Sequence, residues 1–497
     1  MINAAQAFRA QEERLSLPKL VRRVSVIVTL MVAPIAAAVS LPPASFFPSQ
    51  YPTVGLEPYS SATGDFNGDG IPDVAVTNYA SNSVSLLFGK GDGTFGAASQ
   101  IPLSAPPTGI AAGDLRGDGI LDLIVSGHGT DNVFVFLGNG DGTFKPPAIY
   151  TSGNSPRDPV IADLNGDGIL DFATPNVEGD SVSVFLGNGD GTFKPAQTFP
   201  VLAVAPKTVV AGDLNGDGKI DLATGNDNSG NVSVLLGNGD GTFQPAVTYA
   251  AGPGVRDLAI RDFNRDGILD IVTANGGTDT ISVLLGNGDG TFQSPVDYSG
   301  GASPRSLAIG DFNGDGLLDV AVTAYSASVL NIFLGNGDGT FQSGPSITTG
   351  AQPTSVRSAD FNNDGKPDLV VTIGGRPIAP VNLQNYVTVL LNSTLSLSTT
   401  SLTFSSQKLG TTSAALTVVL TNIGAVPVGL SGFSLTGADP GDFKETTTCT
   451  ASLAAGASCT VSVTFSPALT GSRSATLSIS DTAPASPQTV TLRGTGH

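Results

Sequence analysis

The nine residues Asp163-Leu-Asn-Gly-Asp-Gly-Ile-Leu-Asp171 recur along this chain with little change. The copies start at seven aspartates, separated by 49, 49, 50, 49, 49 and 49 residues: Asp65, Asp114, Asp163, Asp213, Asp262, Asp311 and Asp360. A fixed period of this length indicates a repeat architecture in which each copy is one structural unit. Most of the chain is therefore expected to consist of seven similar units.

Apolar runs alternate with turns around each loop. In the second unit, Leu121–Val125 follows the loop, Val133–Leu137 comes next, and the turn Gly138-Asn-Gly-Asp-Gly-Thr-Phe144 leads to a last run near Ala148–Tyr150. With the apolar stretch before the loop, each unit has four short strands, as in a propeller blade. A solenoid of stacked β-coils is the alternative, but its repeats are usually shorter. The pattern favours an all-β, seven-bladed β-propeller.

The seventh unit differs from the others in lacking a fourth strand. It ends after the run Tyr386–Leu391, and no Gly-Asp-Gly-Thr-Phe turn follows. The segment Phe47–Gly55 stands where other units have their fourth strand. We predict that this segment forms the outer strand of the seventh blade, which would remove an exposed sheet edge.

The aspartate loop offers the oxygen ligands that a hard cation requires. In the third loop, the side chains of Asp163, Asn165, Asp167 and Asp171 (positions 1, 3, 5 and 9) and the carbonyl of Ile169 (position 7) are the expected ligands. Glycine at position 6 allows the sharp turn. Ca²⁺ fits this set better than Mg²⁺, which demands a smaller octahedral site and keeps its waters.

Five further loops carry the same pattern. Their predicted ligands are Asp65, Asn67, Asp69, Ile71, Asp73, Asp213, Asn215, Asp217, Lys219, Asp221, Asp262, Asn264, Asp266, Ile268, Asp270, Asp311, Asn313, Asp315, Leu317, Asp319, Asp360, Asn362, Asp364, Lys366 and Asp368. The alternative is an Asx-rich turn without metal, which is common for a single Asp-Gly. Repetition of four ligand positions in phase argues for calcium.

The second loop has Arg116 at position 3, between Asp114 and Asp118. A guanidinium there would compete with a cation for these carboxylates and for Asp122. We therefore predict an empty or weak loop held by Arg116, and about six Ca²⁺ per chain. The loops hold 21 of the 42 acidic residues, so the net charge of −19 is mostly a property of the metal sites.

The Asp-x-Asn-x-Asp-Gly-x-x-Asp loops and the Gly-Asn-Gly-Asp-Gly-Thr-Phe turns resemble FG-GAP (VCBS-type) repeats, which also build the seven-bladed head of integrin α-subunits. The resemblance covers residues 45–392. It implies calcium in the loops that join the first two strands of each blade, on one face of the disc. It also implies ligand binding on the opposite face.

The period disappears after about Leu395, where Ser and Thr become frequent. Strand-like runs at residues 401–404, 416–420, 459–465, 475–479 and 489–492 predict a small immunoglobulin-like β-sandwich over 395–497. Cys449 and Cys459 are expected to form a disulfide, with a buried pair of free thiols as the alternative.

Several short motifs in this segment resemble the HYDIN/choice-of-anchor-D class of bacterial immunoglobulin-like modules. They are the two cysteines, Leu453-Ala-Ala-Gly456, Phe465-Ser-Pro467 and Leu492-Arg-Gly-Thr-Gly496. The resemblance implies a role as a spacer or in surface presentation.

The first 38 residues are typical of a secretory signal peptide. Lys19, Arg22 and Arg23 precede the apolar run Val24–Ile35, and Ala36-Ala37-Ala38 resembles a cleavage site. The run is short for a membrane span, so we expect a secreted or cell-surface protein with no span in the mature chain. The strong acidity argues against nucleic acid as a partner.

Catalytic motifs are scarce. Histidine occurs only at His128 and His497, and there is no Gly-x-Ser-x-Gly, His-Glu-x-x-His or phosphate-binding loop. We therefore expect a non-enzymatic protein.

Four cations recur six residues before the loops of units three to six: Arg157, Lys207, Arg256 and Arg305. We expect them around one mouth of the central channel, where they would hold an anionic ligand such as a uronate-containing glycan. The alternative is pairing with local acids such as Asp158 and Asp257.

These observations favour a monomeric extracellular binding or adhesion scaffold, rigidified by calcium, whose ligand is a glycan or a protein. One rival is an enzyme, or an accessory module of an enzyme, that acts on polysaccharide. The other rival is a structural spacer without a specific ligand.

Overall fold

The computed structural model describes residues 46–374, 385–392, 395–399, 401–422, 427–454, 456–481 and 487–497. The predicted signal peptide lies outside these residues. Strands dominate the described parts of the chain, where the single helical element is the short 3₁₀ helix Pro440–Asp442. Nothing helical in these parts has the length and apolarity needed to cross a membrane.

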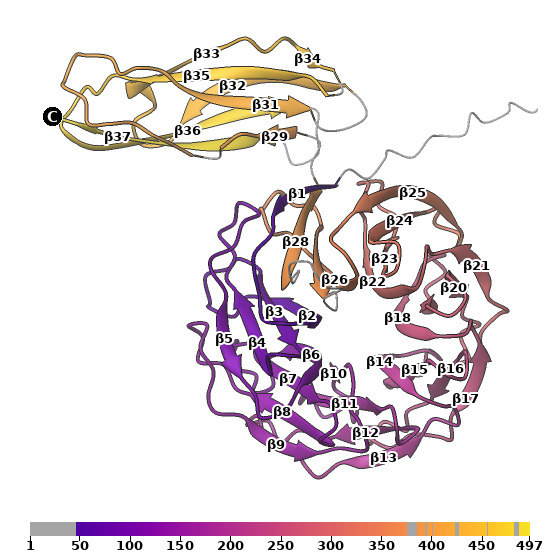
Figure 1. Cartoon of the computed structure of the whole chain (residues 1–497). Coiled ribbons are helices and arrows are strands. Elements are labelled where there is room, and N and C mark those ends of the chain that lie inside the picture. Colours follow the sequence, from indigo (N-terminus) through magenta and orange to yellow (C-terminus); the bar gives the residue numbers. More distant parts are fainter. Residues whose placement is uncertain are drawn as a thin grey trace, which may run out of the picture. The chain divides into compact units, whose positions relative to one another are not determined.

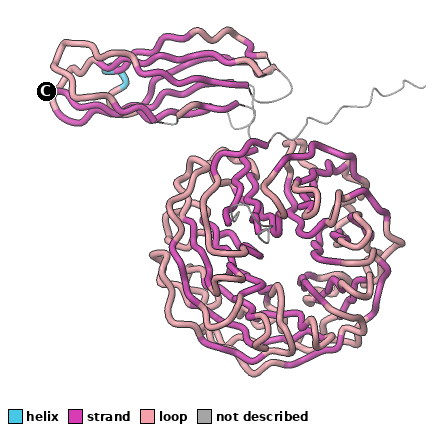
Figure 2. The backbone as a smooth tube through the Cα atoms, in the orientation of Figure 1, coloured by secondary structure: helices cyan, strands magenta, loops and turns pink. Residues whose placement is uncertain are grey.

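Seven four-stranded antiparallel sheets form a ring, as Figures 1 and 2 show. Each sheet is one blade, and its innermost strand is the first of its four in chain order, except in blade seven, where β26 is innermost and β1 is outermost. The seven-bladed propeller predicted from the repeats is confirmed.

The first four blades comprise β2 (Pro58–Gly64), β3 (Asp73–Asn78), β4 (Ser83–Leu87), β5 (Ser99–Pro102); β6 (Pro107–Gly113), β7 (Asp122–Gly127), β8 (Asn132–Phe136), β9 (Ala148–Thr151); β10 (Val160–Ala162), β11 (Asp171–Asn176), β12 (Ser181–Phe185), β13 (Gln197–Pro200); and β14 (Pro206–Gly212), β15 (Asp221–Asn226), β16 (Asn231–Leu235), β17 (Val247–Ala250). The last three comprise β18 (Val255–Arg261), β19 (Asp270–Asn275), β20 (Thr280–Leu284), β21 (Val296–Ser299); β22 (Pro304–Gly310), β23 (Asp319–Ala324), β24 (Val329–Gly335), β25 (Phe341–Thr348); and β26 (Pro353–Ala359), β27 (Asp368–Gly374), β28 (Asn385–Asn392), β1 (Phe46–Gln50).

The core of the propeller lies between neighbouring blades. The second strand of every blade is almost entirely buried because side chains on both of its faces pack against an adjacent sheet. Val84 of blade one and Phe134 of blade two share one apolar cluster, and Val74 of blade one and Val389 of blade seven share another. Runs of Val, Ile, Leu and Phe suit strands that are covered on both faces. Packing between blades therefore continues around the whole ring.

The ring closes through β1. This strand pairs with β28 in antiparallel register, with Phe46 opposite Asn392 and Gln50 opposite Val389. The prediction that an N-terminal segment forms the outer strand of blade seven is confirmed.

The C-terminal region forms two sheets. One has the strand order β29-β31-β35-β33 and the other the order β30-β37-β36-β32-β34. Their bounds are β29 (Leu395–Leu397), β30 (Ser401–Thr403), β31 (Leu416–Asn422), β32 (Val428–Thr436), β33 (Phe443–Thr447), β34 (Ser452–Leu453), β35 (Ser458–Phe465), β36 (Gly471–Asp481) and β37 (Gln488–Gly496). Alternating side chains of both sheets form one apolar core. The predicted sandwich and the Cys449–Cys459 disulfide are both confirmed.

Candidate metal loops and channel-mouth site

The aspartate loops join the first and second strands of each blade. In the third loop, the carboxylate of Asp163 accepts hydrogen bonds from the N–H groups of Gly166 (2.7 Å), Asp167 (3.2 Å) and Gly168 (2.8 Å). Gly168 has φ 82°, and a Cβ there would meet no atom within 4 Å. Glycine is therefore required at position 6 for its left-handed backbone, as the sequence predicted, and not for space.

Position 9 begins the second strand and is fully buried. In Asp171, Oδ2 accepts the N–H of Leu164 (3.0 Å) and Oδ1 accepts the N–H of Gly187 (2.7 Å), so one carboxylate joins the aspartate loop to the glycine-rich turn. The pKa of Asp171 is raised to about 6, first by burial and then by the charges of Asp167 and Asp163. The two hydrogen bonds lower the pKa but do not offset this rise. The same two contacts recur at position 9 of blades one, two, four, five and six.

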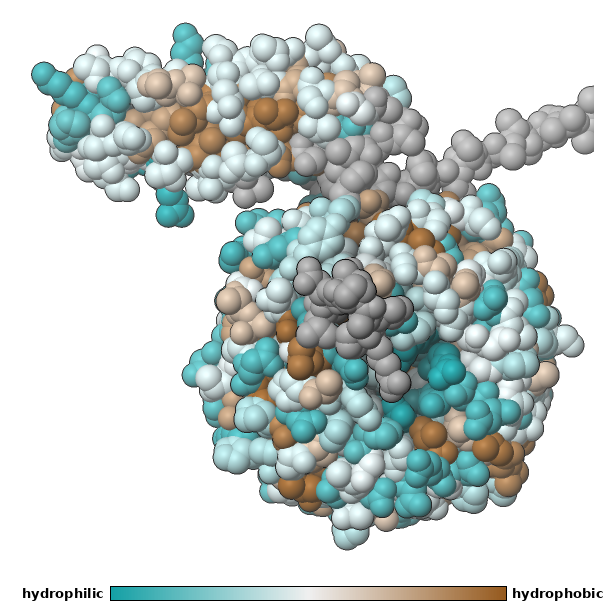
Figure 3. Space-filling view, viewed as in Figure 1, coloured by the Kyte–Doolittle hydropathy of each residue, from teal (hydrophilic) through white to brown (hydrophobic). Residues whose placement is uncertain are grey.

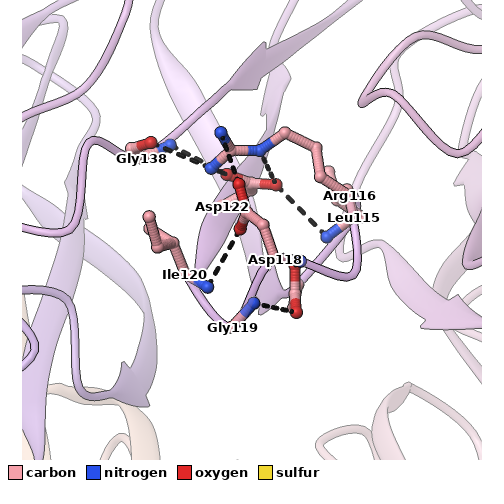
Figure 4. A network of polar contacts seen from close by, with 8 residues as sticks. Leu115, Arg116, Asp118, Gly119, Ile120, Asp122 and Gly138 are labelled. Carbon is pink, nitrogen blue, oxygen red and sulfur yellow. Dashed lines mark hydrogen bonds and ion pairs between the residues drawn. The ribbon is translucent and has the colours of Figure 1, made fainter.

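The second loop differs from the third at position 3 alone, where Arg116 replaces Asn165. Figure 4 shows the Arg116 guanidinium lying between the carboxylates of the loop. Its Nη1 is 2.9 Å from Asp118, and its Nη2 is 2.8 Å from Asp122 and 2.9 Å from the carbonyl of Gly138. These contacts confirm that Arg116 holds the turn.

The Arg116 guanidinium shows that a positive charge can be held between positions 5 and 9 of this loop. The other loops have the same backbone pattern but an asparagine in place of the arginine, and their donors are all oxygens, as Ca²⁺ prefers. Within the described ranges, no three acidic, histidine or cysteine side chains form a group that could hold a metal ion. The donor types fit calcium, but these side chains do not converge on one point, so the predicted ligands stay a prediction.

Exchanging one residue between these two loops should move one calcium ion. We expect the Arg116→Asn variant to bind one Ca²⁺ more than the natural chain, because the change gives the second loop the sequence of the third. We expect the Asn165→Arg variant to bind one Ca²⁺ fewer, because the change gives the third loop the sequence of the second. Equilibrium dialysis with metal analysis measures both. An unchanged count in both variants would contradict calcium binding at these loops.

Blade seven has no glycine-rich turn, and Asn392 takes its place. The N–H of Asn392 donates to Oδ1 of Asp368 (2.8 Å), as the first glycine of the turn does in other blades. Its Nδ2 donates to the carbonyls of Phe312 (2.9 Å) and Pro367 (3.3 Å). Elsewhere the equivalent loop carbonyl accepts a turn N–H from the next blade, as in Gly142 to Phe66 (3.0 Å). Asn392 therefore joins blades six and seven.

Asn392→Ala should lower the free energy of unfolding by about 1–3 kcal/mol, because two carbonyl groups lose their donor at a buried site. Urea unfolding measures this loss. The matched control is Asn188→Ala, whose exposed amide bonds only Thr192, and which should change stability by less than about 0.5 kcal/mol. Equal effects of the two variants would contradict the role of Asn392.

The other end of the innermost strands carries the predicted cations. The position six residues before each aspartate loop is occupied, in chain order, by Tyr59, Thr108, Arg157, Lys207, Arg256, Arg305 and Thr354, of which Thr108 is fully buried. The four predicted cations and Tyr59 line one pocket, together with Asp158, Asp257 and Arg357. Hydrophilic side chains gather near the middle of the ring on the face seen in Figure 3.

Two of the four cations are paired, but with an acid that the sequence did not indicate. Asp227, at the start of the β15–β16 loop, lies 3.6 Å from Lys207 Nζ and 3.2 Å from Arg256 Nε. Pairing with Asp158 or Asp257, the alternative considered above, is not seen among the described residues. Asp257 instead accepts hydrogen bonds from Ser306 (3.1 Å) and the N–H of Leu307 (3.0 Å).

The other two cations contact aromatic rings. The Cζ atoms of Arg157 and Arg305 lie 5.6 Å and 4.6 Å from the ring centroid of Tyr59, and Arg305 also lies 4.9 Å from that of Tyr325. Arg157 Nη1 donates to the Tyr59 hydroxyl (3.1 Å). Burial raises the pKa of Tyr59, but the charges of Arg305 and Arg157 outweigh it and lower the pKa overall. Sequence reasoning missed Tyr59 because it is the only aromatic residue at this repeat position.

Fold and loops together define a β-propeller built from aspartate-loop repeats. The FG-GAP-like repeat matches residues 65–125, 117–174, 176–224, 213–273, 262–322 and 311–371, and the FG-GAP repeat matches 353–390. The HYDIN/CFA65/VesB-like, Ig-like domain matches residues 393–495. The chain belongs to the FG-GAP-like repeat proteins, with a C-terminal Ig-like domain, as the resemblance implied. No curated protein matches it.

The chain resembles several solved structures at low sequence identity. BBS1N, in its complex with ARL6DN, is 9% identical with a TM-score of 0.50, covering 71% of this chain and 97% of that chain. A periplasmic gluconolactonase of Pseudomonas aeruginosa is 18% identical with a TM-score of 0.45, covering 59% and 86%. A Lactobacillus plantarum protein is 14% identical with a TM-score of 0.49, covering 61% and 88%. The likeness to BBS1N supports the propeller fold alone.

Proposed function

We propose that this chain is a secreted, calcium-binding propeller that serves as an extracellular binding or adhesion scaffold for a glycan or protein ligand. The observation that carries the proposal is that the two ends of the innermost strands carry different kinds of residues. Their C-terminal ends lead into the aspartate loops, and their N-terminal ends present cations and Tyr59 at the channel mouth. Loops that fix the blades on one face leave the opposite face for a ligand.

Calcium in this proposal is a structural cofactor. The side chains at positions 1, 3, 5 and 9 and the carbonyl at position 7 would hold it in six loops, with Arg116 supplying the positive charge in the seventh. The ion would balance carboxylates that otherwise repel one another. The disulfide supports an oxidising compartment, in agreement with the proposed signal peptide at 1–38. The proposed domains are the propeller at 45–392 and the sandwich at 395–497, in a monomer.

A calcium count combined with a ligand screen tests this function. We expect about six bound Ca²⁺ per chain, and binding to a subset of ligands on a glycan array or an extracellular-matrix protein array that is lost on chelation. Fewer than two ions per chain, or no ligand in either screen, would contradict the proposal.

An enzyme that acts on polysaccharide is the second candidate. Two carboxyl groups, Asp158 and Asp257, line the channel-mouth pocket, and burial raises the pKa of both. Such groups suit acid–base chemistry. Incubation with acidic and neutral polysaccharides, followed by an assay for new reducing ends, separates this candidate from a binding scaffold.

A further inference from the structure

The channel-mouth pocket holds one buried hydrogen-bond donor and one buried acceptor that have no partner. They belong to consecutive residues, Nε of Arg157 and Oδ1 of Asp158, and both residues line the pocket. An unpaired buried polar group costs about 1–3 kcal/mol, so such atoms are usually paired. Two of them side by side in one pocket indicate a ligand that offers both an acceptor and a donor.

The backbone around these atoms is fixed from two blades. The carbonyl of Arg157 accepts the hydroxyl of Ser126 (2.6 Å), from blade two, and the hydroxyl of Thr174 (3.2 Å), from its own blade. Arg157 Nη1 donates to the Tyr59 hydroxyl, whereas Nε of the same guanidinium has no partner. The donor and the acceptor are therefore presented by a rigid segment and not by a mobile loop.

The charge of the pocket calls for an anion. Burial lowers the pKa of Lys207, and the charge of Arg157 lowers it further, which shows that positive charges are crowded here. Asp227 balances Lys207 and Arg256, whereas Arg305 makes contacts to Tyr59 and Tyr325 and has no acidic partner within the part of the chain that the structure describes. Arg157 and Arg305, which both contact Tyr59, are therefore available to an incoming anion.

The ligand must offer both an acceptor and a donor, and it must carry a negative charge. These two requirements select among anionic groups. A sulfate or phosphate group by itself offers acceptors to Arg157 but no donor to Asp158, and on a sugar its ester oxygen sets the anionic oxygens further from the ring hydroxyl groups than a carboxylate does. A neutral sugar offers a hydroxyl but no charge. A uronic acid unit carries a carboxylate and hydroxyl groups on one small ring, so it satisfies both. The enclosed cavity has a volume of only about 30 Å³, so the carboxylate would enter it and the ring of one sugar unit would stay at its mouth.

We propose that the channel-mouth pocket binds one uronic acid unit, with its carboxylate on Arg157 and Arg305 and a ring hydroxyl donating to Oδ1 of Asp158. This inference rests on the proposed function and names the ligand of that site. The unit is either the end of an acidic glycan or a free sugar acid, since both present the same chemistry.

Calorimetry on the whole calcium-loaded chain tests the proposal with four probes: oligogalacturonate, galacturonate monomer, dextran sulfate and neutral dextran. We expect the natural chain to bind oligogalacturonate at least tenfold more tightly than dextran sulfate, and not to bind neutral dextran. Monomer binding as tight as oligomer binding identifies a free sugar acid as the ligand, and weaker monomer binding identifies a glycan end. Both results support the proposal that the pocket binds a uronic acid unit.

Three variants assign the roles of the residues. Arg157→Gln and Arg305→Gln should each weaken oligogalacturonate binding at least tenfold, because each removes a charge-assisted hydrogen bond. Asp158→Asn should reduce the preference for oligogalacturonate over dextran sulfate, because a neutral amide oxygen is a weaker acceptor for the ring hydroxyl than a carboxylate, whereas both anions gain equally from the loss of the negative charge. The control for the two arginine variants is Lys145→Gln, which replaces an exposed lysine of blade two, gives the same change in net charge as they do and should leave affinity unchanged.

Thermal unfolding of each variant shows whether it folds. Arg305→Gln is the variant least expected to disturb folding, because Arg305 forms only ring contacts among the described residues. Equal binding of uronate and sulfate by the natural chain, or no uronate binding at millimolar concentration, would overturn the assignment. A ligand from the array screen that binds with full affinity to Arg157→Gln and Arg305→Gln would overturn this inference and leave the proposed function standing. Absence of calcium and of any ligand would overturn the proposed function itself.

Discussion

Chelation of calcium is expected to lower the melting temperature of the propeller by more than about 10 °C. A site at 100-fold excess of calcium over its dissociation constant contributes about 2.7 kcal/mol to stability, and six such sites together contribute more than about 10 kcal/mol. One kcal/mol shifts the melting temperature of a domain of this order of size by about 1–4 °C. Without the ion, burial and then the charges at positions 5 and 1 raise the pKa of the position 9 carboxylate in each of the six loops. This carboxylate is fully buried where the loop meets the rest of the blade.

Scanning calorimetry with and without EGTA measures this shift. Excess Ca²⁺ should restore the original melting temperature, whereas Mg²⁺ at the same concentration should restore less of it, because Mg²⁺ demands a smaller, octahedral site. A melting temperature that is unchanged by EGTA, in a chain that binds no calcium, would mean that the loops are metal-free Asx turns.

The second large effect is expected at position 9. Asp171→Ala should lower the free energy of unfolding by about 2–6 kcal/mol, because the buried N–H groups of Leu164 and Gly187 each lose their acceptor at about 1–3 kcal/mol. The loss should be larger with calcium than after chelation, because the variant also removes a proposed ligand of the ion. Urea unfolding in both conditions measures the two values.

Asp122→Ala in the second loop is the matched control, because the two loops differ only at position 3. It should also be strongly destabilising, since two buried N–H groups lose their acceptor and Arg116 loses one of its two carboxylate partners. Its cost should not depend on calcium. If the cost of Asp171→Ala is equally independent of calcium, position 9 is not a ligand of the ion.

Local periodicity predicted most of the architecture. Seven in-phase loops gave the number of blades, and the missing turn after Leu391 placed β1 in the last blade. The contacts of Arg116 were also predictable, because its partners lie within six residues of it in the same loop. These features depend on residues that are close in sequence or repeated in register.

Contacts between blades were not predictable in this way. Asn392 bonds Phe312, 80 residues earlier, and nothing in its own neighbourhood marks it as a replacement for a turn. Asp227 pairs with Arg256 because strands of adjacent blades bring them together. Tyr59 contacts Arg157 across the mouth, 98 residues away. A residue type that occurs in only one of the seven repeats, such as Tyr59, produces no periodic pattern in the sequence. Its partner is brought close to it only when the blades close into a ring.

The way in which the ring closes decides how it responds to mechanical load. Phe46 lies opposite Asn392, so the two chain segments that leave the β1–β28 ladder do so at the same end of it. Tension applied between these segments would break the hydrogen-bonded residue pairs of the β1–β28 ladder one after another, starting at Phe46 and Asn392. It would not load all the pairs of the ladder at the same time. Tension that enters through the blades and leaves through residue 392 passes along β28 and does not load β1. The ring thus withstands pulling through a bound ligand better than pulling between its own two ends.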